Sequence, residues 1–248
     1  MRLTFNNARV WRYVMGGAGK FVESGMLIIN DYGLLFKAMD PSRVALIEFQ
    51  IPRESFDDFE IDGEVKIAIN VEDLSKVLRS SEKDDRISLD ISENSLTIVL
   101  ERKGLQRMFT LPLQVTGEVE AIPELKLDLK NRFKVSGTAL YDGLSSIEDL
   151  GDVLTLNIGE EELRLRVSSD LGEAEVVFDT GSGNLIEYEV SEPGTEVSYG
   201  LDYFTYIKPV IRISEVIDIL LSPEMPCKLS MDLPQGAKMN YYVAPRID

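Results

Sequence analysis

Apolar residues recur along this chain in short stretches, in most of which they alternate with polar residues. Ile87, Leu89 and Ile91 are typical, since every second side chain of a strand points to the same face. The alternation predicts a protein built mainly of half-buried strands. We expect strands over residues 25–30, 34–39, 43–51, 86–91, 95–100, 105–111, 126–135, 152–158, 162–168, 172–179, 215–221, 226–232 and 238–243, another before residue 71, and extended segments near 185–200.

Four segments have helical spacing instead, and they divide the chain into two halves of the same order. We expect helices over residues 8–18, 71–79, 137–149 and 201–208, the last ended by Pro209. In each half, two helices are each followed by three strands, and a repeat of this length favours two similar domains. The sequence therefore predicts an α+β fold with an N-terminal domain over 1–117, a connecting loop over 118–128 and a C-terminal domain over 129–248.

The segment over residues 39–51 carries apolar side chains on both faces of its predicted strand. Ala45, Ile47, Phe49 and Ile51 can enter a core, whereas Met39, Val44 and Leu46 point the other way. Residues 241–248 form a second apolar stretch, at a position where a polar tail is more usual. We therefore expect a partner to cover both segments, with a loop of the chain itself over Met39 and Leu46 as the alternative.

These two segments resemble those of DNA polymerase sliding clamps, the proliferating-cell-nuclear-antigen family of archaea and eukaryotes. The resemblance is carried by Met-Asp-Pro-Ser-Arg-Val-Ala-Leu over residues 39–46 and Tyr-Tyr-Val-Ala-Pro-Arg-Ile-Asp over 241–248. Weaker resemblance runs through residues 69–78 and 121–124. The family often has His at the position of Arg43 and Leu at that of Val243, differences that bear on partner preference.

The resemblance implies the DNA clamp fold, in which two similar domains of antiparallel sheets with two helices each assemble into a closed trimeric ring. Such a ring encircles double-stranded DNA independently of sequence and serves as a processivity factor. The implied partners are DNA polymerase, the clamp loader, flap endonuclease and DNA ligase, which bind through a Gln-x-x-aliphatic-x-x-aromatic-aromatic peptide. The resemblance assigns the pocket for that peptide to Met39, Arg43, Val44, Leu46, Ile122, Pro123, Leu127, Gly200, Pro226, Tyr242, Val243, Ala244 and Pro245.

Two further strands are flat and apolar, over residues 105–111 and 174–178. Unpaired strand edges of this kind tend to pair with another chain, although either segment alone could be an ordinary edge under a loop. The resemblance implies that the two edges meet head to tail between subunits. We assign this interface to Leu105, Arg107, Phe109, Leu111, Glu175 and Val177.

The formal charge of −17 argues against attraction of DNA by the protein as a whole, because phosphates are repelled at a distance. Encirclement removes the conflict, since it needs only a weakly positive inner wall. Lys76 and Arg79 lie opposite the packed face of their helix. The predicted helix over 137–149 departs from this pattern, because its charged residues are all acidic. Together with positions implied by the resemblance, the DNA-facing residues are Arg12, Lys20, Lys76, Arg79 and Lys208.

The residue types exclude several kinds of catalysis. The chain has no His, and Cys227 is its single cysteine, so Ser-His-Asp triads, Cys-His dyads, His-bearing zinc sites and thiolate clusters are excluded. The glycines before Lys20 lack the spacing of a phosphate-binding loop. An acid pair such as Asp57 and Glu60 is better read as solvated surface. We therefore expect no enzymatic activity, no cofactor and no metal.

Two alternatives stay open. One is a subunit of a heterotrimeric clamp with paralogous chains, and the other, from a different class, is a carboxylate-based hydrolase. No signal peptide or membrane span is recognised. The absence of His and the presence of only four Gln favour an archaeal source. A cytoplasmic, nucleoid-associated location is expected for an archaeal protein and a nuclear one for a eukaryotic protein.

Overall fold

The computed structural model describes residues 1–82, 84–115, 122, 124–170 and 172–247. The chain divides into two compact units, each considered by itself below. The first comprises Met1–Pro41, Ile47–Pro123 and Leu233–Met239, and the second Ser42–Leu46, Glu124–Asp232 and Asn240–Asp248. The domain boundaries at residues 117 and 128 stay a prediction, since 116–121 and 123 lie outside the described residues.

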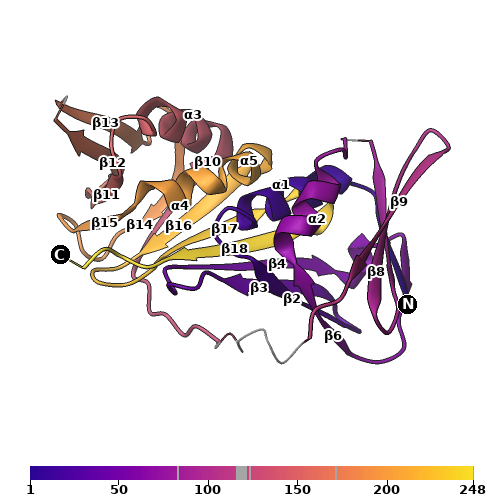
Figure 1. The fold of residues 1–248 in the computed structure, drawn as a ribbon. Helices are drawn as coiled ribbons and strands as arrows, with labels where there is room; N and C mark the ends of the chain where they lie inside the picture. The colour runs from indigo at the N-terminus through magenta and orange to yellow at the C-terminus, as the bar shows by residue number, and fades with distance from the viewer. Residues whose placement is uncertain (83, 116–121, 123, 171, 248) are drawn as a thin grey trace. The chain divides into compact units, whose positions relative to one another are not determined.

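The first unit combines antiparallel strands with a pair of helices. Within it, α1 and α2 lie side by side, and β8 and β9 form a hairpin (Figure 1). Five strands form one sheet in the order β5-β1-β7-β8-β9, and others follow the order β4-β3-β2-β6. The elements are β1 (Arg2–Phe5), α1 (Ala8–Ala18), β2 (Ser24–Asn30), β3 (Gly33–Met39), β4 (Ala45–Pro52), β5 (Asp58–Glu60), β6 (Val65–Asn70), α2 (Val71–Leu78), β7 (Arg86–Ile91), β8 (Ser95–Arg102) and β9 (Leu105–Pro112). The first two residues of β4 belong to the second unit.

Local chemistry explains the helices of this unit. The side-chain oxygen of Asn70 accepts a 2.8 Å hydrogen bond from the backbone N–H of Asp73, which caps the start of α2. On α1, Trp11 is fully buried and packs edge-on against Phe49, with ring centroids 5.4 Å apart. One face of each helix is buried. The remaining residues are half-buried on α1, and exposed or half-buried on α2.

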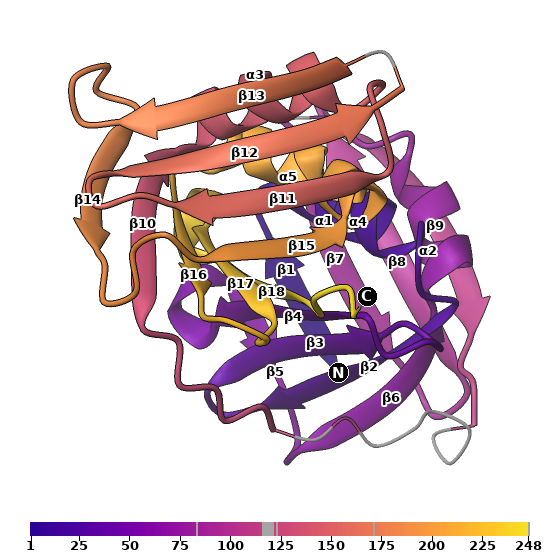
Figure 2. The ribbon, with the colours of Figure 1, turned by 90° about the vertical axis from the view of Figure 1, so that its left-hand side faces the viewer.

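The second unit repeats this organisation. The strands β11, β12 and β13 lie side by side with α3 and α5 behind them (Figure 2). The sheet orders are β13-β12-β11-β15 and β14-β10-β16-β17. The elements are β10 (Asn131–Ser136), α3 (Gly137–Ile147), β11 (Val153–Ile158), β12 (Glu162–Ser169), β13 (Gly172–Asp179), β14 (Leu185–Glu189), β15 (Glu196–Gly200), α4 (Leu201–Tyr206), α5 (Lys208–Ile213), β16 (Val216–Leu221), β17 (Cys227–Asp232) and β18 (Lys238–Val243), which begins in the first unit.

The α+β class and the antiparallel sheets are confirmed, with local differences. The strands β1 and β5 were not expected, and β10 begins at Asn131 rather than at residue 126. The prediction that Pro209 ends a helix is wrong. α4 ends at Tyr206, and Pro209 lies in the first turn of α5, where its fixed φ fits and its missing N–H costs nothing.

Candidate subunit, DNA and partner surfaces

Two strands at sheet edges are left without a second partner in the described part of the chain. β9 pairs with β8 alone and β13 with β12 alone. Leu105 and Met108 on β9 are 66% and 65% exposed, and Val177 on β13 is 37% exposed. Each strand also has one helix against it, α2 on β9 and α3 on β13. Both predicted interface segments therefore lie at open sheet edges.

The predicted interface residues of these strands differ in their exposure and in the contacts that they make within the chain. Phe109 and Leu111 are half-buried, and Glu175 accepts a 3.0 Å hydrogen bond from Arg164. The guanidinium of Arg107 is held inside the subunit, 2.6 Å from the carboxylate of Asp85. Met108 is a further exposed apolar residue of this edge that the sequence analysis did not assign to the interface. Its exposure can be recognised only from the structure.

On β13, the side of the strand that faces α3 is closely packed. A Cβ added at Gly143 of α3 would lie 3.0 Å from a methyl group of Val176. The absence of a side chain at Gly143 therefore leaves room for Val176 at this close approach. Glu173, Glu175 and Val177, which are exposed, lie on the opposite face of the strand.

The segment over 42–46 and the C-terminal tail meet within the second unit. The N–H of Ala244 donates to the carbonyl of Val44 at 2.7 Å, and the N–H of Arg246 donates to the carbonyl of Ser198 at 2.8 Å. A groove of about 560 Å³ lies alongside, lined in part by Glu196, Ser198 and Pro245. The tail is thus held as an extended segment beside β15.

Burial changes the assignment of the predicted peptide pocket. Leu46 and Val243 are only 4% and 0% exposed, so the expectation that Leu46 needs a partner to cover it is wrong. Apolar residues occupy both faces of the strand here, and the chain itself buries both. Tyr242 is also buried, with the ammonium of Lys228 above its ring, 5.6 Å from the centroid.

The remaining pocket residues are more accessible or lie elsewhere. Arg43 is exposed, with a left-handed φ of 58°. Met39 and Ile122 belong to the first unit, and Pro123 lies outside the described residues. The half-buried members in the second unit are Val44, Leu127, Gly200, Pro226, Ala244 and Pro245.

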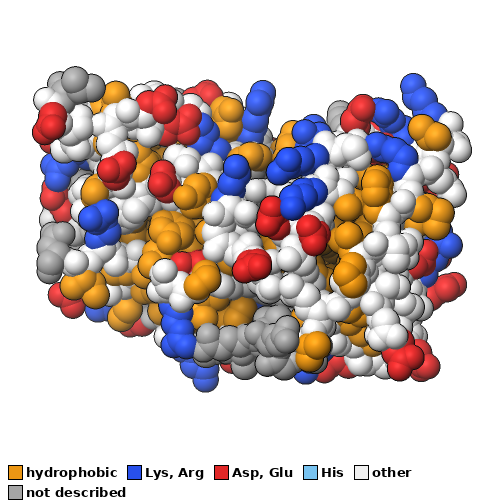
Figure 3. Space-filling model, in the orientation of Figure 1, with side chains coloured by type: hydrophobic (Ala, Val, Ile, Leu, Met, Phe, Trp, Pro, Cys, Tyr) orange, Lys and Arg blue, Asp and Glu red, His pale blue; other side chains and the backbone are white. Residues whose placement is uncertain are grey.

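Lys and Arg side chains gather on the face that carries α1 and α2 (Figure 3). Lys20, Lys76 and Arg79 are exposed there, but Lys76 is also paired, 2.8 Å from Glu72 and 3.5 Å from Asp73. The hydrogen bond from Lys76 lowers the pKa of Glu72, and the same bond raises the pKa of Lys76. Arg12 is half-buried and donates to the carbonyl of Ser81 at 2.8 Å.

In the second unit, the ammonium of Lys208 is engaged in an ion pair. Its side chain is 12% exposed, and its Nζ lies 2.5 Å from a carboxylate oxygen of Glu148. The exposed Arg212 lies over the ring of Tyr141 at 5.3 Å, as Lys208 does at 5.2 Å. Arg212 was missed in the sequence. It lies in the last turn of a six-residue helix, which is too short to give a periodic signal.

Among the residues the structure describes, no group of three or more His, Cys, Asp or Glu side chains could hold a metal ion. Within the same residues, no helix is both long and apolar enough to cross a membrane.

Two compact units with open antiparallel edges and paired helices define a clamp-like class of protein. Residues 1–116 match the family described as proliferating cell nuclear antigen, N-terminal domain. The chain is 31% identical over 247 residues to DNA polymerase sliding clamp 1 of Pyrobaculum aerophilum, covering 99% of this chain and 98% of that protein. It is 30% identical over 250 residues to the sliding clamp of Thermofilum pendens, covering 100% of both.

Solved structures give the same result. A chain of the PCNA2-PCNA3 complex from Sulfolobus tokodaii superposes with a TM-score of 0.90 at 30% identity, covering 99% of each chain. PCNA from Thermococcus kodakaraensis, at 22% identity and a TM-score of 0.87, shows the fold alone. The chain therefore belongs to the PCNA family of DNA polymerase sliding clamps, as the sequence segments indicated.

Proposed function

We propose that this chain is one subunit of a closed trimeric ring that encircles duplex DNA and tethers DNA polymerase to it. The observation that carries the proposal is the pair of open edges, β9 in the first unit and β13 in the second. Unpaired edges with exposed apolar residues are a liability unless another chain covers them. An open edge in each unit suits head-to-tail assembly, which must close to avoid filaments.

The charge of the chain fits encirclement better than adhesion. A net charge of −17 opposes attraction of a phosphate backbone, whereas a closed ring holds DNA by topology. The exposed Lys20, Lys76, Arg79 and Arg212 need then only provide weak, sequence-independent contacts. α3, whose exposed charged residue is Asp142, contributes nothing to such contacts.

The tail and the 42–46 segment are the proposed docking site for client proteins. Polymerase, clamp loader, flap endonuclease and ligase would bind by a Gln-x-x-aliphatic-x-x-aromatic-aromatic peptide. Support comes from the Ala244 to Val44 hydrogen bond, which holds the two segments together, and from the half-buried side chains around them. Leu46 and Val243 shape this site from beneath, because both are buried.

A ring with paralogous chains is the second candidate. Relatives of this chain include sliding clamps 1 and 3 of Aeropyrum pernix, and the similar structure from Sulfolobus tokodaii is described as a complex of two different chains. Sedimentation of the purified chain separates the two arrangements. A homotrimer sediments at three subunit masses by itself, whereas a heteromeric subunit does so only after mixing with its paralogues.

The test of clamp function compares two DNA substrates. The assembled ring, loaded by a clamp loader, should stay on nicked circular DNA and should be lost when the same DNA is linearised, because a ring slides off free ends. Polymerase products should lengthen in the same samples. Equal retention on circular and linear DNA would contradict encirclement.

A further inference from the structure

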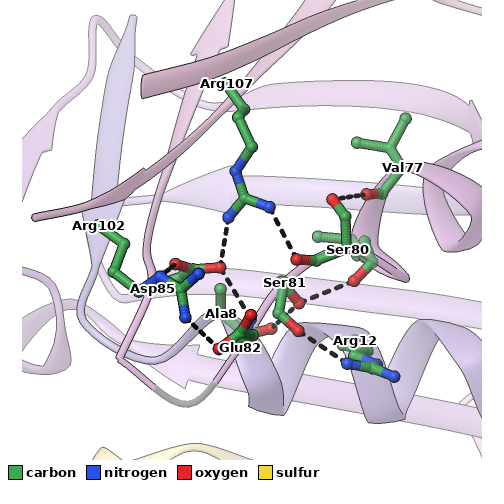
Figure 4. Close-up of polar contacts among 10 residues, drawn as sticks. Ala8, Arg12, Val77, Ser80, Ser81, Glu82, Asp85, Arg102 and Arg107 are labelled. Atoms are coloured by element: carbon green, nitrogen blue, oxygen red, sulfur yellow. Dashed lines mark hydrogen bonds and ion pairs between the residues drawn. The ribbon is translucent and has the colours of Figure 1, made fainter. Parts of the chain in front are cut away.

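Asp85 lies at the centre of a network of charged side chains at one end of the five-stranded sheet (Figure 4). It directly precedes β7, and its side chain is 0% exposed. One carboxylate oxygen accepts from the backbone N–H of Glu82 at 2.8 Å and from Arg107 at 2.6 Å. The other lies 3.4 Å from the Nε of Arg102. A buried carboxylate of this kind is tolerated because cations surround it.

The two arginines come from neighbouring strands of the sheet. Arg102 ends β8 and Arg107 lies near the start of β9, so one carboxylate ties β7 to both strands beyond it. β8 is already fixed by pairing on both sides, whereas β9 is paired only with β8 in the described chain. The Asp85 contact is therefore worth most to β9, whose outer edge is free.

Arg107 forks between two acceptors, as a planar guanidinium can. One terminal nitrogen donates to Asp85, and the other donates to the carbonyl of Ser80 at 2.8 Å. The next carbonyl, that of Ser81, accepts from Arg12 of α1. The turn after α2 is thereby held between the first helix and the edge strand.

We propose that Asp85 is a positioning residue for assembly: its buried carboxylate holds Arg107, and with it the free edge strand β9, in the arrangement that pairs with a neighbouring subunit. The inference rests on the proposed ring and deepens it. A strand edge can template a second strand only if its own backbone is held flat and in register. Arg107 therefore contributes through the contacts that it makes within its own subunit, to Asp85 and to the carbonyl of Ser80.

The experiment compares Asp85→Asn, Arg107→Gln, the double variant and Arg102→Gln as a matched control. Arg102→Gln removes the second cation that contacts Asp85. Arg102 lies on β8, which is paired with a strand on each side. Sedimentation over a concentration series should show each of the first two variants weakening assembly about tenfold or more, close to 1.4 kcal/mol. The double variant should weaken assembly by less than the sum of the two single changes, because both of them break the contact between Asp85 and Arg107. Arg102→Gln should stay within about twofold of wild type.

Amide exchange of residues 105–112 supplies the readout that separates positioning from general stability. Exchange there should accelerate in Asp85→Asn and Arg107→Gln, ahead of the rest of the sheet. A variant that loses thermal stability but keeps wild-type assembly and wild-type exchange of β9 would overturn the positioning role alone. A wild-type chain that stays monomeric, with and without clamp paralogues, would overturn the ring and this role together.

Discussion

The backbone N–H of Ala244 and the carbonyl of Val44 form a 2.7 Å hydrogen bond between segments 200 positions apart in the chain. Both segments belong to the second compact unit. The side chains beside this bond divide into two kinds, since Leu46 and Val243 are buried while Val44 and Ala244 are half-buried. Stability and client binding should therefore respond to different residues here.

Replacing Leu46 with Ala should destabilise the fold by about 2–5 kcal/mol, because a buried leucine leaves a cavity. Chemical denaturation measures the change. Val44→Ala is the matched control, with a smaller loss because Val44 is only half-buried. Equal, small losses for both variants would show that Leu46 is not part of the core.

Ending the chain after Ala244 should weaken client-peptide binding while the fold survives. The truncation keeps Val243 and the bond to Val44 but removes the Arg246 contact to Ser198 and one wall of the groove. Loss of such backbone and apolar contacts should lower the affinity about tenfold or more. Calorimetric titration with a Gln-x-x-Leu-x-x-Phe-Phe peptide measures it. Unchanged affinity would place the docking site elsewhere.

The outcome for Leu46 shows where sequence reasoning stops. Alternation located most strands closely, because period-two patterns survive wherever one face is buried. It failed where both faces are buried, as at Leu46, and where strands are as short as β5, whose residues are mostly exposed. The ion pairs could not be predicted from the sequence either. Arg107 pairs with a carboxylate 22 positions away and Lys208 with one 60 positions away, and no local pattern records such contacts.

Reversing the charge of Arg79 should reduce DNA contact more than reversing that of Lys76. Both side chains are exposed, but the ammonium of Lys76 already lies 2.8 Å from Glu72 and is partly neutralised. Each lost phosphate contact lowers the slope of log affinity against log salt by about 0.9. Titration of the assembled clamp with a fluorescent duplex at several salt concentrations should give nearly this decrease for Arg79→Glu. Equal decreases for Lys76→Glu would contradict the pairing argument.

Lys208→Met should act on stability and Arg212→Gln on DNA contact. Lys208 is largely buried and donates to Glu148. Its replacement leaves the carboxylate of Glu148 without this partner and should lower the free energy of unfolding by roughly 1–3 kcal/mol. Arg212 is exposed, and its replacement should leave the unfolding free energy nearly unchanged. Denaturation and duplex titration of both variants, with Glu148→Gln as the partner control, test this division. If the Lys208→Met variant keeps its stability and binds DNA poorly, Lys208 contacts DNA and the division is wrong.

Cys227 should resist thiol reagents in the folded chain at every pH from neutral to mildly alkaline. Its thiol is fully buried, and burial raises its pKa, so less of it is thiolate at a given pH than in the unfolded chain. The folded state holds the thiol proton of Cys227 more tightly than the unfolded state does. The free energy of unfolding should therefore fall as the pH rises past the ordinary thiol pKa of about 8.5.

Ellman's reagent should react slowly with the wild type and promptly after denaturation. An added exposed thiol, Ser182→Cys, is the control and should react promptly in the native state. Prompt labelling of native Cys227 that increases with pH would show that the strand carrying it opens readily.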